Sequence, residues 1–437
     1  MKAGRIFLIF ISIIALNSCS FEQGKKGDSV ENFLSSILKT HRISSNHYSE
    51  IVTDSLGHSY IASFAKKSDN RDYVQIIKLD HDGVVLWIKG GRYKGRSTAI
   101  SLSNNGNILV TGWADSILDF DGFRIEEEDN AKVFVAELDH NGRCLNMMTF
   151  KSDGVFNIRS NNKGLILVSG ACNSDNRFGK FELNDESKKC KYFIGMLDDE
   201  LNFIWVKSVD YQIVRIKNYQ DDFYISGKFN TKMTADTLSL YTSSDMDEDG
   251  YVFKMNYKGK VAWAHQFGLK NAPLEYATSK ESGGDIAFAK NGDVLVSAVI
   301  NSEFRIDQNT LNVFRFGKHG NRVEKFELEG GMTTSISTLN VDVNDNIWIT
   351  GNKALNEIPS IQGNQNNYSF ISQYSSDFDK IRDIEISHGK NMIFRSSYYK
   401  DSTLRYTGHF QGQLKIDKDS LTNDGEHEMF LYQRKVD

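Results

Sequence analysis

Residues 104–112 read Asn-Asn-Gly-Asn-Ile-Leu-Val-Thr-Gly, a polar turn followed by a short apolar segment that ends in a small residue. Asn and Gly tolerate the positive φ that a tight hairpin turn requires, and a short apolar run beside such a turn is typical of a β-strand. The pattern recurs along the chain, with 49 to 71 residues between the ends of neighbouring copies. Its seven strand segments are residues 59–63, 108–112, 166–170, 223–227, 294–298, 347–351 and 404–408.

The third and fourth strands of a copy form a second hairpin. Residues 76–88 read Ile-Ile-Lys-Leu-Asp-His-Asp-Gly-Val-Val-Leu-Trp-Ile, and residues 133–147, 193–206 and 253–264 repeat this form. Trp87, Trp205 and Trp263 fall at the same place in it, which predicts a repeated packing socket rather than a ligand site.

Four short strands in each unit and seven units predict an all-β fold, a seven-bladed β-propeller of four-stranded antiparallel blades. The chain shows no sustained 3.6-residue period that would indicate helices. A solenoid is the alternative, but it would prefer shorter, more uniform repeats with special caps.

The block of residues 104–150 resembles the bacterial beta-propeller repeat family. It has the Asn-Gly-Asn turn, the Thr-Gly strand end, a loop containing Asp-Phe and the hairpin Phe-Val-Ala-x-Leu-Asp-x-x-Gly. The resemblance extends over about residues 33–437, although copies one and five end in Ser63 and Ala298 instead of Gly. Copy five also has Glu324 where a Trp would stand. This family shares an architecture and not one activity, so the resemblance implies the fold and little about function.

The N-terminus predicts export and a lipid anchor. Lys2 and Arg5 precede an apolar run over residues 6–16, which is shorter than the ~20 residues that a membrane-spanning helix needs and fits a secretory signal. The ending Leu-Asn-Ser-Cys19 resembles a bacterial lipobox, in which the cysteine is acylated and becomes the mature N-terminus. We therefore expect a signal peptide at 1–18, a lipidated tether at 19–31 and a propeller domain at 32–437. The alternative is an ordinary signal peptide with an incidental Cys19.

This reading places the protein in the bacterial cell envelope, held by its lipid anchor at the outer membrane. Ser20 rather than Asp after the cysteine favours that membrane, by family resemblance only.

Composition and motifs exclude several classes of function but do not identify one. The net charge is −5 with both signs well mixed, so nothing favours a nucleic-acid partner. The sequence has no nucleophile elbow, no His-Glu-x-x-His, no Cys-x-x-Cys and no phosphate-binding loop. We therefore predict no catalytic residue, no cofactor and no metal ligand.

One acidic loop resembles a calcium-binding segment. The run from Asp245 to Asp249 reads Asp-Met-Asp-Glu-Asp and precedes Gly250, as in loops that wrap calcium. The twelfth position, where an EF-hand has Glu, is Asn256, so a solvated acidic loop is the preferred interpretation.

Cysteines offer one possible bridge. Cys172 ends a second strand and Cys190 starts the third strand of the same copy, which favours a Cys172–Cys190 disulfide in an exported protein. Two free buried thiols are the alternative, because the geometry of a bridge cannot be read from sequence.

The predicted function is a non-catalytic binding or scaffold module for a protein or glycan partner. Loops on rigid scaffolds carry function, so we expect the partner on the long second-to-third loops. A carbohydrate-active enzyme is the alternative, because carboxylates are too numerous to exclude a catalytic pair. A purely structural envelope component is a third candidate. The long loops are residues 114–131, 173–189, 230–249 and 352–367.

The ends of the chain predict how the ring closes. The last copy stops near its third strand, residues 429–434, and a propeller that stayed open would expose strand edges. Residues 33–39 alternate as a strand does, and we expect them to pair with residues 429–434 as the missing strand. A short amphipathic helix at 33–39 is the alternative.

Overall fold

A computed structural model describes most of the chain after residue 49. The described residues are 5–8, 50–66, 72–114, 118–125, 133–172, 177–183, 191–244, 247–268, 281–300, 310–328, 333–354, 367–384, 386–388, 392–400, 402–416 and 419–435. No helix in this part of the chain could cross a membrane.

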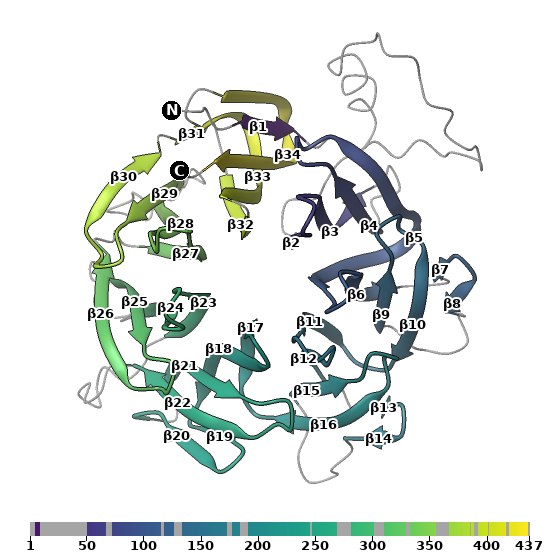
Figure 1. The fold of residues 1–437 in the computed structure, drawn as a ribbon, viewed down its shortest axis with the longest axis horizontal. Helices are drawn as coiled ribbons and strands as arrows, with labels where there is room; N and C mark the ends of the chain where they lie inside the picture. Colours follow the sequence, from purple (N-terminus) through teal and green to yellow (C-terminus); the bar gives the residue numbers. More distant parts are fainter. Residues whose placement is uncertain are drawn as a thin grey trace, which may run out of the picture.

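Antiparallel sheets follow one another around a central opening (Figure 1). Sheet 1 contains β2 (Glu50–Thr53), β3 (Ser59–Lys66), β4 (Asp72–Leu79), β5 (Val85–Leu102), β6 (Ile108–Ala114), β9 (Val133–Leu138) and β10 (Cys144–Phe150). Its long strand β5 pairs with β4 by its first half and with β6 by its second half, so it joins two four-stranded units.

Four further sheets have four strands each. Sheet 2 contains β11 (Gly154–Ser160), β12 (Ile166–Ala171), β15 (Tyr192–Leu197) and β16 (Phe203–Val209). Sheet 3 contains β17 (Gln212–Tyr219), β18 (Asp222–Asn230), β21 (Glu248–Met255) and β22 (Val261–Phe267). Sheet 4 contains β23 (Ser282–Phe288), β24 (Val294–Ile300), β25 (Thr310–Phe316) and β26 (Arg322–Leu328). Sheet 5 contains β27 (Thr333–Val341), β28 (Ile347–Ala354), β29 (Asn367–Tyr374) and β30 (Lys380–Ile384).

Sheet 6 combines the two ends of the chain. It contains β31 (Ile386–His388), β32 (Met392–Lys400), β33 (Thr403–Ile416), β34 (Asp419–Lys435) and β1 (Arg5–Leu8). All seven segments predicted as second strands lie in strands, namely in β3, β6, β12, β18, β24, β28 and β33. The predicted antiparallel, all-β architecture is therefore confirmed.

The glycine that ends most second strands has a steric cause. The first strand of each unit is the innermost, and in β11 a β-bulge shifts the register between Val155 and Asn157. The bulge brings the inner strand so close that a Cβ at Gly170 would overlap the carbonyl oxygen of Gly154. In β24 the corresponding residue is Ala298, and the inner-strand residue paired with it is Gly283, which has no side chain.

Buried clusters join each sheet to the next around the ring. One contains Leu167 of sheet 2 with Ile216 of sheet 3, and another contains Ile51 of sheet 1 with Met429 and Leu431 of sheet 6. The first and last sheets therefore share an apolar core, which stabilises the ring by removing both faces from water.

The three tryptophans in register form the predicted packing sockets. Trp87 Nε1 donates to the carbonyl oxygen of His140 (3.2 Å), and Trp205 Nε1 donates to that of Tyr257 (3.1 Å). Each Trp lies on an outermost strand and contacts a turn of the following unit, so the socket locks neighbouring units together. Trp263 packs in the same way against Gly320.

The outer edge of β34 carries a different strand from the expected one. Arg5–Leu8 pairs with it antiparallel, with Arg5 opposite Gln433 and Leu8 opposite Phe430. Residues 33–39, which we expected at this edge, lie outside the described residues. Because β1 already uses the N–H and C=O groups of this edge, the predicted pairing of 33–39 cannot form while β1 is in place.

Candidate functional site

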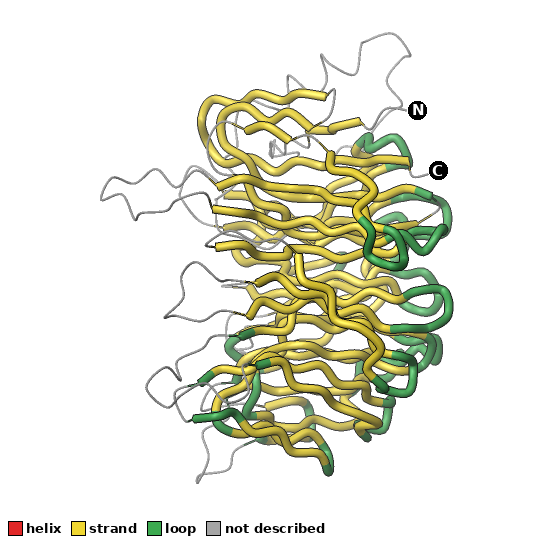
Figure 2. The backbone as a smooth tube through the Cα atoms, turned by 90° about the vertical axis from the view of Figure 1, so that its left-hand side faces the viewer, coloured by secondary structure: helices red, strands yellow, loops and turns green. Residues whose placement is uncertain are grey.

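The short turns of the ring share one hydrogen-bonded form and gather on one face, here called the turn face (Figure 2). In the turn that starts at Asp80, Asp80 N donates to the carbonyl oxygen of Val84 and Gly83 N donates to that of Asp80. The carboxylate of Asp80 also accepts hydrogen bonds from the N–H groups of Asp82 and Val84. Turns with the same backbone hydrogen bonds start at Asp54, Asp80, Ser103, Asp139, Asn161, Asp198, Asn256, Ala289, Gly317, Asp342 and Ser375.

The fourth position of these turns is left-handed and is usually Gly. Asp345 occupies it with a φ of 61°, a conformation that few residues other than Gly adopt at low cost. Asp345 Oδ1 accepts a hydrogen bond from Lys290 N (2.9 Å), so the carboxylate ties two neighbouring turns together. The strained position therefore aims a carboxylate at the adjacent unit.

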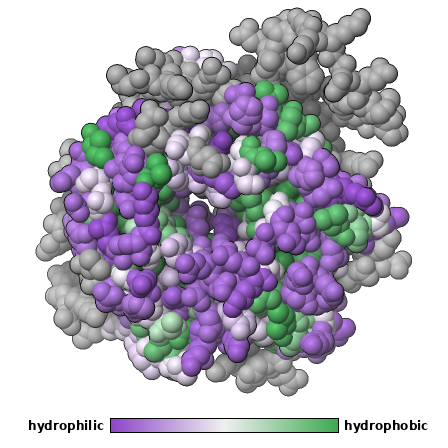
Figure 3. Space-filling view, in the orientation of Figure 1, coloured by the Kyte–Doolittle hydropathy of each residue, from purple (hydrophilic) through white to green (hydrophobic). Residues whose placement is uncertain are grey.

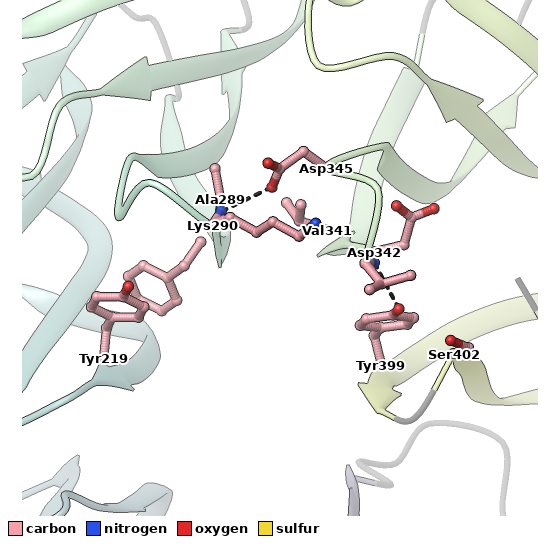
Figure 4. Close-up of a pocket in the computed structure, with 10 residues that line it drawn as sticks. Tyr219, Ala289, Lys290, Val341, Asp342, Asp345, Tyr399 and Ser402 are labelled. Atoms are coloured by element: carbon pink, nitrogen blue, oxygen red, sulfur yellow. Dashed lines mark hydrogen bonds between the residues drawn. The ribbon is translucent and has the colours of Figure 1, made fainter. Parts of the chain in front are cut away.

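A pocket of about 450 Å³ opens on the turn face beside the central opening (Figure 4). Its volume lies within the range of small-molecule sites. Hydrophilic residues largely surround the central hollow seen along the ring axis (Figure 3). The pocket is lined by Tyr219, Phe288, Ala289, Lys290, Val341, Asp342, Val343, Asp345, Tyr399 and Ser402.

Three aromatic rings flank the pocket. Tyr219, at the end of β17, packs on Phe288 of β23 with ring centroids 4.9 Å apart and planes inclined by 30°. On the opposite side, Tyr399 Oη accepts a hydrogen bond from Val343 N (2.7 Å). The rings are thus held in place by the ends of inner strands and by the turns.

The Asp342 carboxylate serves the fold. It is 3% exposed, and its Oδ1 accepts from the N–H groups of Asn344 and Asn346 at 2.8 and 2.9 Å. Its Oδ2 accepts from Trp348 Nε1 (2.9 Å) and from Asn346 Nδ2 (3.1 Å). Because both of its oxygens already accept hydrogen bonds from the fold, this carboxylate holds the turn and the start of β28 in place.

Charged residues link the inner strands around the central opening. Arg159 of β11 forms an ion pair with Glu50 of β2 and donates to the carbonyl oxygen of Ile100 (3.0 Å). Ile100 N donates in turn to Glu50 Oε2 (3.0 Å). Burial would raise the pKa of Glu50, but the Arg159 guanidinium and these hydrogen bonds outweigh it and hold that pKa below its ordinary value.

A second charged group lies farther around the ring. Asp285, 5% exposed, lies 3.6 Å from Lys217 Nζ and 3.9 Å from Arg215 Nε, and its Oδ2 accepts from Leu339 N (2.9 Å). The two groups bind inner strands of different sheets to each other.

The long loops, expected to bind a partner, form hairpins on the rim where they are described (Figure 1). In the first, Asp121 accepts a hydrogen bond from Cys144 N (2.7 Å) at the start of an outermost strand and pairs with Lys89. In the third, Asp236 accepts from Val261 N (3.3 Å) in the corresponding way. These parts of the loops therefore protect strand edges, and the described pocket lies on the other face. The hairpins are β7–β8 (Leu118–Phe120, Phe123–Ile125), β13–β14 (Arg177–Phe178, Phe181–Glu182) and β19–β20 (Lys232–Ala235, Leu238–Tyr241).

The acidic loop is less exposed than the sequence suggests. Asp247 and Asp249 are buried with Glu281, and one oxygen of each carboxylate lies within 4.8 Å of the others. A solvated loop is therefore the wrong description of these two residues, whose side chains accept hydrogen bonds from Ser243 and Gln266. Three oxygens at this spacing could hold a hard cation such as calcium. Asp245 lies outside the described residues, and the absence of a strong calcium site stays a prediction.

The cysteines are partly described. Cys172 is disulfide-bonded, whereas Cys19 and the expected partner Cys190 lie outside the described residues. Cys144 is a free thiol, and burial together with the nearby Asp121 carboxylate raises its pKa to about 12. Cys144 is therefore an unreactive core residue.

The pocket residues were not singled out from the sequence. Lys290 and Val343 stand in turns that read as structural, and Tyr219 and Tyr399 end inner strands without any motif. Asp345 could have been noticed in the sequence, because it stands at the turn position that is usually Gly.

Comparisons with known proteins bear on the fold. The sequence matches no family model and no curated protein. Among solved structures the chain is similar to polysaccharide lyase Uly1, with a TM-score of 0.52 and 11% identity over 100% of this chain and 99% of that one. It is also similar to the beta-propeller domain of the Trilobed protease from Pyrococcus furiosus, with a TM-score of 0.47 and 8% identity over 87% and 97% of the two chains. A third is BamB from Moraxella catarrhalis, with a TM-score of 0.39 and 10% identity over 88% and 83%.

The class of protein follows from the sheets. Antiparallel four-stranded units around one central opening define a β-propeller. At such low identity the likeness to Uly1 concerns the fold alone.

Proposed function

We propose that this chain is a lipid-anchored lipoprotein of the bacterial envelope, whose propeller is a non-catalytic module for binding a protein or glycan. The lipobox-like ending at Cys19 supports the anchor, and the pocket on the turn face supports the binding role. Cys19 would carry the acyl chains and hold the propeller at the outer membrane.

The observation that carries the binding role is how the pocket uses its carboxylates. Asp342 accepts four hydrogen bonds from its own sheet, and Asp345 accepts one from the neighbouring turn. A glycosidase needs two carboxylates that face a substrate and exchange protons with it. Both oxygens of Asp342 are used by the fold, and only Asp345 keeps an oxygen for a ligand, so the described lining offers one such carboxylate, which favours recognition over turnover.

A carbohydrate-active enzyme is the second candidate. Aromatic rings beside carboxylates near the central opening favour it. Depolymerisation of any member of a polysaccharide panel by the purified protein would establish it and contradict the non-catalytic proposal.

We also propose seven blades and closure of the ring by an N-terminal segment. Counting β5 once with β4 and once with β6 gives seven four-stranded units. Removal of residues 1–18 with the signal peptide would take β1 away, and residues 33–39 would then pair with residues 429–434. Deleting residues 30–40 should lower the melting temperature of the whole domain, and an unchanged transition would contradict this closure.

Site-specific crosslinking tests the binding role. A photoreactive amino acid at Val343, in the pocket, should capture an envelope component in intact cells. The same residue at Leu56 is the matched control, because Leu56 is exposed in the corresponding turn that starts at Asp54. Equal capture at both positions, or capture at neither, would contradict a partner in this pocket.

A further inference from the structure

The pocket on the turn face offers both apolar ring faces and hydrogen-bonding groups. Tyr219 and Tyr399 stand on opposite sides of it, and Lys290 extends between them (Figure 4). Because Phe288 packs on Tyr219 and Val343 N donates to Tyr399, both walls are preorganised. A ligand would therefore meet rings that need little ordering on binding.

The groups between these walls include a donor and an acceptor. No described carboxylate lies within 4 Å of Lys290 Nζ, and no described donor pairs with Asp345 Oδ2, since the hydrogen bond from Lys290 N goes to Oδ1. The left-handed backbone at Asp345 and the hydrogen bond from Lys290 N fix its carboxylate beside the backbone of Lys290. Lys290 can thus donate and Asp345 can accept within the same pocket.

The charges of the residues that line the pocket favour a neutral ligand over an anionic one. Asp342 and Asp345 contribute two negative charges against one positive charge from Lys290, so the lining is net negative by one. A carboxylated or sulfated ligand would meet repulsion as well as attraction there. A neutral ligand rich in hydroxyl groups would satisfy the donor and the acceptor without that cost.

We infer that the pocket binds a neutral saccharide unit, an inference that rests on the proposed binding function and names its ligand class. A pyranose ring presents C–H groups on its faces and hydroxyl groups around its edge. The C–H groups pack against the electron-rich face of Tyr219 on one side of the pocket or of Tyr399 on the other. The hydroxyl groups accept from Lys290 Nζ and donate to Asp345 Oδ2.

Isothermal titration calorimetry with the full-length protein in detergent tests the ligand class. The probes are neutral gluco-, manno-, xylo- and galacto-oligosaccharides, compared with oligogalacturonate, sulfated galacto-oligosaccharides and acidic peptides. At least one neutral class should bind, and its Kd should change less than about twofold between low and high salt, because no charge pair forms. Binding confined to the acidic probes, or no binding by any neutral class, would overturn the inference.

Variants locate the binding in this pocket. Tyr219→Ala should weaken binding roughly tenfold through loss of one wall. Lys290→Gln should weaken it by a similar factor through loss of the charged donor. Tyr257→Ala and Lys258→Gln, in the turn at Asn256 on the same face, are matched controls and should leave the Kd unchanged. Equal effects of pocket and control variants would also overturn the inference.

The outcomes separate this inference from the proposed function. Capture of a protein at Val343, together with no binding of neutral oligosaccharides, would retain the binding module and reject the saccharide. Capture at neither Val343 nor Leu56 would reject the binding role itself.

Discussion

Replacing Arg159 with Met should destabilise the protein through the charge it leaves behind. The side chains of Glu50 and Arg159 are 21% and 9% exposed, so the carboxylate would lose its partner in a largely buried place. Breaking a buried ion pair in this way costs about 3–5 kcal/mol, and the partial exposure of Glu50 favours the lower end. We therefore expect the free energy of unfolding to fall by about 3 kcal/mol at pH 7.

The stability lost in Arg159→Met should depend on pH. In the wild type the folded pKa of Glu50 is depressed, so its stabilisation is present above the ordinary value near 4.5 and is lost as pH falls through the folded pKa. In Arg159→Met, burial without the guanidinium raises that pKa, and the folded state then takes up a proton first on acidification. The difference between the two proteins should therefore shrink from pH 7 towards pH 4.

Urea denaturation followed by tryptophan fluorescence measures both effects. The double variant Glu50→Gln/Arg159→Met is the control, since it removes both charges and should recover much of the lost stability. A loss below ~1 kcal/mol at pH 7, or a loss that is the same at pH 7 and pH 4, would refute the argument.

Three other outcomes are expected. Gly320→Ala places a Cβ inside contact distance of the Trp263 ring at a φ of +87°, whereas the control Gly106→Ala has a φ of +81° and no atom within 4 Å. Gly320→Ala should therefore lower the unfolding free energy by ~1–3 kcal/mol more than the control does. Equal losses in urea denaturation would contradict the packing of Trp263 on this turn. Metabolic labelling with a fatty acid should mark the wild type and not Cys19→Ser, and labelling of both would reject the lipobox. Peptide mapping without reductant should recover Cys172 joined to Cys190, a bridge that contributes ~3 kcal/mol, and a free Cys190 thiol would reject that pairing.

The repeat could be read from sequence because it has a local physical cause. Gly170 is small because the bulged inner strand leaves no space for a side chain, and the turn residues are Asn, Asp and Gly because they cap a fixed hydrogen-bonded form. Such requirements recur around the ring and leave the same residue types in most units. Strands and turns were therefore predictable in place as well as in kind.

The site was not predictable, because it depends on contacts between units. Tyr219 and Tyr399 are 180 positions apart in the sequence, and nothing in their neighbourhoods indicates that one pocket lies between them. The long loops attracted the functional expectation because they vary in length, yet Asp121 shows that one of them is fixed to a strand edge. A variable loop length is therefore found both in loops that bind a partner and in loops that cover a strand edge, and it does not distinguish the two.

In the turns that repeat around the ring, the positions that hold the backbone differ from the positions that a partner would contact. Backbone hydrogen bonds hold each turn, and in most turns the side chain at the first position adds to them, although that position is Ala289 in one pocket turn. The second position, occupied by Lys290 and Val343 in the pocket, provides no side-chain hydrogen bond to that frame. Substitutions there would alter what the face recognises at little cost to folding. Descendants of one such ring could thus diverge in ligand while keeping an unchanged scaffold, and a designer could exploit the same freedom by varying only these positions.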